Sequence, residues 1–142
     1  MPEKKIRILI VDHHRPIRES WKLLLESSPR FEVVALCADA RSAVDEVEEH
    51  RPDIVLMDIN IDALDGLAAT RELLKRDPRI RVIGISVNNQ PTYARRMLEA
   101  GGRGYITKTS PYEEIWHGIR EIHEGRIYIS EEVRKQMNEA NH

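Results

Sequence analysis

The feature that most constrains the fold of this chain is a regular alternation of short apolar runs with longer segments of helical periodicity. The apolar runs are four to six residues long and rich in β-branched side chains, which is typical of buried strands. We expect strands at residues 6–11, 31–36, 54–57, 81–86 and 104–107. Strands that alternate with helices in this way favour one parallel sheet with right-handed crossovers and helices on both faces. The sequence therefore predicts an α/β fold: a doubly wound, five-stranded parallel sheet with five helices.

The helix that follows the fifth strand has the clearest boundaries. Ser110 is the expected N-cap, and Glu113 falls three residues after it, a spacing that predicts a capping box. Gly125 is expected to end this helix. We place the domain boundary there, with the domain at residues 1–125 and a C-terminal tail at residues 126–142. The tail is expected to hold a short strand-like piece and a small helix.

Composition and charge exclude several classes of protein. The chain has 142 residues, of which 41% are hydrophobic and 32% charged, an ordinary composition for a globular domain. Lys and Arg total 22 against 24 for Asp and Glu, so the net charge of −2 creates no overall field that attracts nucleic acid or an anionic membrane. Cys37 is the single cysteine, which excludes an internal disulfide and suits a reducing compartment. We therefore expect a cytoplasmic domain with no direct nucleic-acid binding and no membrane partner.

Polar residues stand at the ends of four expected strands. Asp12 and His13 follow the first strand and Asp58 the third, while Ser86 ends the fourth and Lys108 follows the fifth. The carboxyl ends of strands form the functional edge of a doubly wound sheet. Two carboxylates suit Mg²⁺, and a carboxylate can also act as a nucleophile that forms an aspartyl phosphate. A metal, a lysine and a hydroxyl could each neutralise one phosphoryl oxygen, so the sequence predicts a cation-assisted phosphoryl site.

Several segments carry a resemblance to a protein family. The segments are ILIVDHH, DIVLMDINIDALDG, VIGIS and GYITK. Together they resemble the receiver domain of two-component response regulators, over residues 6 to about 125. The resemblance implies a flavodoxin-like receiver fold. The sequence is most similar to the LuxR/FixJ-type branch of transcriptional regulators, whose output is a helix-turn-helix domain. Either the chain is a stand-alone receiver or it precedes such a domain, and the segment EGRIYIS favours the second alternative.

The resemblance also implies a phosphoacceptor and a metal site. Asp58 matches the residue that a sensor histidine kinase phosphorylates, and it also matches a metal ligand. Asp12 matches the first of two acids that hold Mg²⁺, and the backbone carbonyl of Asn60 matches a further ligand. The implied protein is a signalling module that catalyses only its own phosphorylation and dephosphorylation. It is not a metabolic enzyme.

Three more residues match the parts of a receiver that respond to phosphorylation. Ser86 matches the switch hydroxyl that turns toward the phosphoryl group, and Lys108 matches the lysine that binds it. Tyr105 matches the aromatic residue whose rotamer changes with the switch. The resemblance implies that phosphorylation shifts an existing equilibrium between two states.

Three positions depart from the family pattern. His13 stands where a second acid is usual, and a neutral imidazole is a poorer ligand for Mg²⁺, so we expect weaker magnesium binding or a preference for Mn²⁺. Asp62 stands where proline is usual. Val87 follows the switch hydroxyl, and its branched side chain, next to Asn88, is expected to modulate access to Asp58.

Two alternatives stay open at this point. The departures at His13, Asp62 and Val87 are also compatible with a degenerate receiver, a phosphorylation-independent scaffold for protein interactions. Trp116 lies off the apolar stripe of its expected helix. It either packs along the helix flank or contributes to a face for a homodimer or another partner. The other members of that face would be Tyr105, Tyr112, Arg95 and Arg96.

Overall fold

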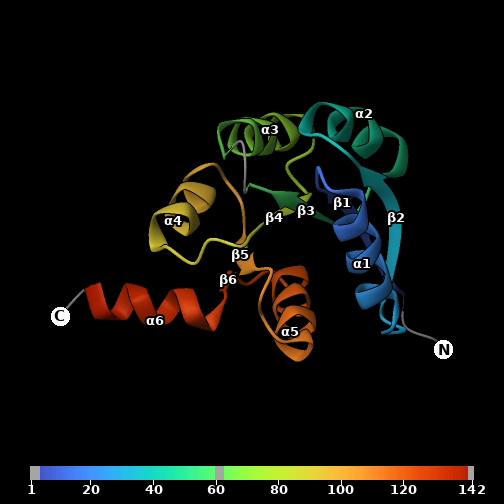
Figure 1. Cartoon of the computed structure of the whole chain (residues 1–142). Coiled ribbons are helices and arrows are strands. Elements are labelled where there is room, and N and C mark those ends of the chain that lie inside the picture. The colour runs from blue at the N-terminus through green and yellow to red at the C-terminus, as the bar shows by residue number, and fades with distance from the viewer. Residues whose placement is uncertain (1–3, 60–62, 141–142) are drawn as a thin grey trace.

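One six-stranded parallel sheet organises the molecule, with helices on both sides (Figure 1). The structure is a computed structural model that describes residues 4–59 and 63–140. The strands follow the order β2-β1-β3-β4-β5-β6, and every neighbouring pair is parallel. The elements along the described chain are β1 (Ile6–Val11), α1 (Arg15–Glu26), β2 (Phe31–Cys37), α2 (Ala40–His50), β3 (Ile54–Asp58), α3 (Ala63–Arg76), β4 (Arg81–Ser86), α4 (Pro91–Glu99), β5 (Gly104–Thr107), α5 (Tyr112–His123), β6 (Tyr128–Ile129) and α6 (Glu131–Ala140). This architecture confirms the predicted doubly wound α/β class.

The sheet separates two hydrophobic cores. Successive side chains of a strand point to opposite faces, so β1 contributes Ile8 and Ile10 to one core and Leu9 and Val11 to the other. Helices α1 and α5 cover the first core, and α2, α3 and α4 cover the second. Burial on both faces explains why the inner strands β1 and β3 hold continuous apolar runs, from Ile8 to Val11 and from Ile54 to Met57. None of the described helices is long and apolar enough to cross a membrane.

The contact between α1 and α5 bears on the open question about Trp116. The indole Nε1–H of Trp116 donates a hydrogen bond of 3.2 Å to the backbone carbonyl of Leu24 in α1, and the ring packs against the core under these helices. Tyr112 is exposed and lies near it, with 6.4 Å between ring centroids. Packing along the helix flank therefore accounts for Trp116.

The tail adds a strand and a helix to the predicted five of each. β6 pairs in parallel with β5 and so extends the sheet, and α6 lies against α4. These elements are the strand-like piece and the small helix that the sequence predicts after Gly125. The pairing itself is not visible in the local pattern, because β6 is only two residues long.

The prediction of a capping box at Ser110 is wrong. α5 begins at Tyr112 after Pro111, and its N-terminus has no side-chain cap. The Ser110 hydroxyl is buried instead, within 2.8 Å of Thr107 Oγ1 and 3.0 Å of Ser130 Oγ. Ser130 comes from the β6–α6 segment, so a contact between distant parts of the sequence replaces the local cap.

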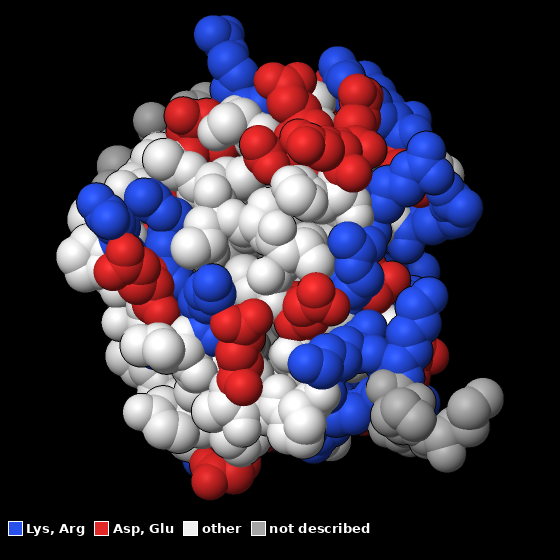
Figure 2. Space-filling view, turned by 90° about the vertical axis from the view of Figure 1, so that its right-hand side faces the viewer, with Lys and Arg blue, Asp and Glu red and all other residues white. Residues whose placement is uncertain are grey.

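Charges of both signs occur on the face of the molecule that Figure 2 shows. Acidic side chains gather near the top of this view and basic ones along its right-hand edge, where the two groups adjoin, and uncharged side chains fill much of the middle and left. Neither sign covers the whole face. Acidic and basic side chains are thus unevenly distributed on this face, although the formal net charge of the whole chain is only −2.

The close approach of β6 to β5 depends on Gly104. A Cβ added at this position would lie 2.5 Å from the backbone oxygen of Tyr128 and 2.5 Å from Ile122 Cδ1. We expect Gly104→Ala to displace β6 and to lower the free energy of unfolding by about 2 kcal/mol. Urea denaturation measures the loss, and hydrogen exchange at residues 128–129 reports the displacement. An unchanged midpoint would contradict the tight packing of this edge.

Candidate functional site

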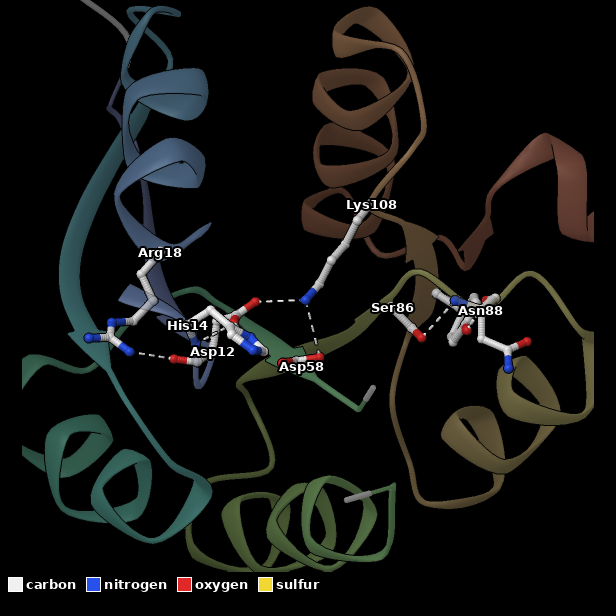
Figure 3. A network of polar contacts seen from close by, with 8 residues as sticks. Asp12, His14, Arg18, Asp58, Ser86, Asn88 and Lys108 are labelled. Atoms are coloured by element: carbon white, nitrogen blue, oxygen red, sulfur yellow. Dashed lines mark hydrogen bonds and ion pairs between the residues drawn. The ribbon is translucent and has the colours of Figure 1, made fainter. Parts of the chain in front are cut away.

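Two carboxylates and one ammonium group meet at the carboxyl ends of the strands (Figure 3). Val11 pairs with Met57, so the next residues, Asp12 and Asp58, lie side by side at the ends of β1 and β3. Lys108 follows β5, and its Nζ lies 2.8 Å from Asp12 Oδ2 and 3.3 Å from Asp58 Oδ1. The structure therefore brings together the three charged residues that the sequence predicts for the site.

The three charged groups are almost fully shielded from solvent. The side chains of Asp12, Asp58 and Lys108 are 0%, 2% and 9% exposed. Burying a charge is costly unless an opposite charge compensates it, and here one ammonium faces two carboxylates. The formal charge of the trio is −1, so the site favours a further cation. The same trio could hold a phosphoryl group if that group arrived with a metal ion.

Asp12 is held in place by several backbone contacts. Its backbone N–H donates to the carbonyl of Cys37 at 3.0 Å, and its Oδ1 accepts the backbone N–H of His14 at 2.9 Å. The guanidinium of Arg18 in α1 donates to the Asp12 carbonyl at 2.6 Å. Sequence reasoning missed Arg18, because one arginine on a helix carries no signal that it contacts a strand end.

An open cavity of about 690 Å³ borders the acidic pair. Asp12 and Asp58 line it together with His13, which is exposed, and with residues of α2 and α3. Two carboxylates at the edge of an open cavity are a donor set that fits Mg²⁺, which takes hard oxygen ligands and keeps several waters. His13 places an imidazole at the same cavity. Asn60, the predicted carbonyl ligand, and Asp62 lie outside the described residues.

Ser86 and Tyr105 both bind the backbone of Asn88. The buried Ser86 hydroxyl accepts the backbone N–H of Asn88 at 3.0 Å, and Figure 3 shows it turned toward Asn88 rather than Asp58. The Tyr105 hydroxyl donates to the Asn88 carbonyl, and burial raises the pKa of Tyr105. Lys108 is connected to the same strand, because its backbone N–H donates to the carbonyl of Ser86 at 2.8 Å. The loop after β4 is therefore tied to both predicted switch residues.

Val87 lies on a different side of the site from the acidic cavity. Val87 is 57% exposed, and it lines a mostly apolar groove of about 370 Å³ together with Lys108 and residues of α1 and α5. Lys108 connects the two hollows, because it lines the groove beside Val87 and its ammonium contacts Asp12 and Asp58, which line the cavity. The predicted effect of Val87 and Asn88 on access stays a prediction.

The fold and the site together define a class: doubly wound domains whose strand ends carry an acidic pair and a lysine. Residues 8–120 match the family model of the response regulator receiver domain, and the chain belongs to that family. Its relatives place it in the LuxR/FixJ-type branch.

The similar proteins agree with this family. The chain is 37% identical over 135 residues to the transcriptional regulatory protein DegU of Brevibacillus brevis, covering 95% of this chain and 57% of DegU. It is 33% identical over 132 residues to the response regulator GacA of Pseudomonas viridiflava, covering 93% of this chain and 62% of GacA. The crystal structure of a LuxR-family two-component response regulator from Aurantimonas sp. SI85-9A1 superposes with a TM-score of 0.91 at 33% identity, covering 97% of this chain and 99% of that one. The chain thus spans about three fifths of the length of the curated relatives it matches.

Proposed function

We propose that a sensor histidine kinase phosphorylates this receiver on Asp58 and that the aspartyl phosphate switches an output. The observation that carries this proposal is the Lys108 ammonium, which lies between the buried carboxylates of Asp12 and Asp58. The output we propose is regulation of transcription, as the name of the relative DegU suggests. The helix-turn-helix domain that would carry it out is what the resemblance to the LuxR/FixJ-type branch implies. The receiver would act in the cytoplasm.

The proposed chemistry is a transfer of one phosphoryl group. A carboxylate oxygen of Asp58 attacks the phosphorus of a phosphohistidine, and a P–O bond forms while the P–N bond breaks. The imidazole nitrogen of the kinase leaves with the electron pair of that bond. Lys108 binds a phosphoryl oxygen and thereby neutralises part of its charge. Attack of water on the phosphorus later releases inorganic phosphate and restores the Asp58 carboxylate. In this scheme the receiver catalyses only its own phosphorylation and dephosphorylation.

The proposed cofactor is Mg²⁺, with Mn²⁺ as the alternative that His13 suggests. Asp12, Asp58 and the backbone carbonyl of Asn60 would hold the ion. When bound, the ion would neutralise phosphoryl charge that Lys108 leaves uncompensated. The imidazole of His13 would weaken the attraction for Mg²⁺, because it contributes no negative charge to the cavity.

The proposed switch is an exchange of hydrogen bonds at Ser86. To donate to a phosphoryl oxygen on Asp58, the Ser86 hydroxyl must turn away from the Asn88 backbone N–H that it now binds. The Asn88 backbone then loses the hydrogen bond to Ser86 and keeps the one from the Tyr105 hydroxyl. Phosphorylation would thus shift the population of loop conformations, as differential binding requires.

The test of this proposal is the intact mass of the chain after incubation with acetyl phosphate. We expect a gain of one phosphoryl group in the presence of Mg²⁺ or Mn²⁺ and no gain in Asp58→Asn. A gain with Mn²⁺ alone would assign the change in metal preference to His13. If no metal supports a gain while circular dichroism shows an intact fold, the phosphorylation-independent scaffold is the better account.

Val87 gives a further prediction about the lifetime of the phosphorylated state. We expect Val87→Ala to speed loss of the phosphoryl group about threefold, because a smaller side chain beside Lys108 gives water easier access. Decay of the phosphorylated mass over time measures the rate. The control is Tyr112→Ala, which truncates a similarly exposed side chain on the same groove, at the first residue of α5. Equal decay in Val87→Ala and the wild type would contradict a role for Val87 in access.

A further inference from the structure

The start of α6 contacts both the loop after β4 and the turn that carries Lys108 through one side chain, that of Glu132. The Glu132 carboxylate accepts hydrogen bonds from Thr107 Oγ1, from Thr109 Oγ1 at 3.0 Å and from Asn89 Nδ2 at 3.5 Å. Thr107 and Thr109 are the two neighbours of Lys108 in the sequence, and Asn89 follows Asn88, which Ser86 and Tyr105 bind. Glu132 therefore connects the turn that carries Lys108, the loop after β4 and the first turn of α6.

A buried network of hydroxyl groups makes this connection rigid. Ser130 is fully buried, and its Oγ accepts the backbone N–H of Thr107 at 2.9 Å. Ser110 Oγ lies within hydrogen-bond distance of both Thr107 Oγ1 and Ser130 Oγ. Since buried polar groups are costly to leave without partners, a shift of the Lys108 turn must be accommodated by the residues that begin α6.

A second carboxylate holds the start of α6 without touching the site. Glu114 of α5 accepts the Tyr128 hydroxyl at 2.6 Å and the backbone N–H of Glu131 at 2.8 Å. Within the described part of the chain, Glu114 forms no hydrogen bond with the Lys108 turn or with the loop after β4. Both carboxylates thus anchor the start of α6, but of these two only Glu132 also contacts the Lys108 turn and the loop after β4. Comparing variants of the two separates the anchoring of α6 from the contact with these segments.

We propose that Glu132 is a positioning residue that couples phosphorylation of Asp58 to the anchoring of α6, an inference that rests on the function proposed above. When Ser86 releases Asn88 and Lys108 moves toward a phosphoryl group, the long contact from Asn89 is the first that Glu132 loses. The first turn of α6 then opens more often. Because coupling between two sites is reciprocal, loss of the Glu132 contacts also changes the two segments beside the phosphorylation site.

Hydrogen exchange with mass spectrometry tests this coupling on the 142-residue chain. The variants are Glu132→Gln, Glu114→Gln and Glu131→Gln. Glu114 is the anchor that does not contact the Lys108 turn, and Glu131 is a neighbour whose side chain forms an exposed ion pair with Lys135. Each is measured before and after acetyl phosphate, and intact mass verifies phosphorylation. We expect phosphorylation to speed exchange at residues 133–136 about fivefold in the wild type, in Glu131→Gln and in Glu114→Gln. In the Glu132→Gln variant, we expect residues 133–136 to exchange fast both before and after phosphorylation. The dependence on phosphorylation therefore disappears in this variant.

The outcomes separate this inference from the proposed function. A dependence on phosphorylation that persists in Glu132→Gln, or that is missing in a fully phosphorylated wild type, overturns the coupling. If the wild type gains no phosphoryl group, the proposed function fails. The exchange rates measured without acetyl phosphate then test whether Glu132 positions the two segments beside the site. In those measurements Glu132→Gln must speed exchange at residues 88–90 and 107–110, whereas Glu114→Gln must not. Equal exchange of those residues in both variants overturns the positioning role.

Discussion

Replacing Lys108 with methionine is expected to lower the free energy of unfolding by about 3 kcal/mol. Methionine has a similar length but no charge, so Asp12 and Asp58 would lose the ammonium that lies 2.8 Å and 3.3 Å from their carboxylates. Removing one partner of a buried charge cluster costs more than removing an exposed ion pair, because the remaining charges stay buried. Urea denaturation at pH 7 and low divalent-ion concentration measures the loss.

The matched control for this prediction is Lys135→Met. Lys135 lies 3.7 Å from Glu131 in an exposed pair on α6, and such pairs contribute about 0–1 kcal/mol. The same chemical change there should leave the midpoint nearly unchanged. If both variants lose equal stability, the ammonium of Lys108 does not compensate the two carboxylates. Lys108→Met should also slow phosphoryl uptake from acetyl phosphate by about a hundredfold, because a preorganised cation for the phosphoryl oxygens is gone.

Replacing His13 with aspartate is expected to raise the affinity for Mg²⁺ by about tenfold to a hundredfold. His13 lines the same cavity as Asp12 and Asp58, so a third carboxylate would face the bound ion. Two unit charges 4 Å apart attract by about 4 kcal/mol at an effective dielectric constant of 20, of which desolvation removes a large part. Titration calorimetry measures the affinity, and phosphoryl uptake at low Mg²⁺ concentration should rise with it.

A charge change outside the cavity controls for the overall charge of the molecule. His117→Asp makes the same substitution in α5, where His117 is exposed and lies against Tyr128. It should leave the affinity for Mg²⁺ within about twofold of the wild type, because salt screens distant charges. If His13→Asp and His117→Asp bind Mg²⁺ equally well, the imidazole at position 13 does not set the metal preference.

Much of the fold is predictable from this sequence because its inner strands are buried on both faces. Continuous apolar runs locate β1 and β4, and the helical segments between them impose parallel order. The same logic finds Asp12, Asp58 and Lys108, since the carboxyl ends of parallel strands meet at one edge of the sheet. These residues need no long-range information beyond the strand order.

The parts that sequence reasoning missed depend on contacts between distant residues. Ser110 satisfies the local pattern of a capping box, but its hydroxyl lies within hydrogen-bond distance of the hydroxyl of Ser130, which is 20 residues away in the sequence. Glu132 lies 25 residues from Thr107, and nothing in the sequence around α6 marks that contact. Both contacts arise because β6 pairs with β5 and carries the start of α6 to the site. A two-residue strand has too little periodicity to predict this pairing.

The most direct measurement of the central claim is chemical trapping of the phosphorylated residue. After incubation with acetyl phosphate, borohydride reduces an aspartyl phosphate to homoserine, and tandem mass spectrometry of the peptides locates the changed residue. We expect homoserine at position 58 and unchanged aspartate at position 12. Homoserine at position 12, or no reducible phosphate while acetyl phosphate and a divalent metal are present, would contradict Asp58 as the phosphoacceptor.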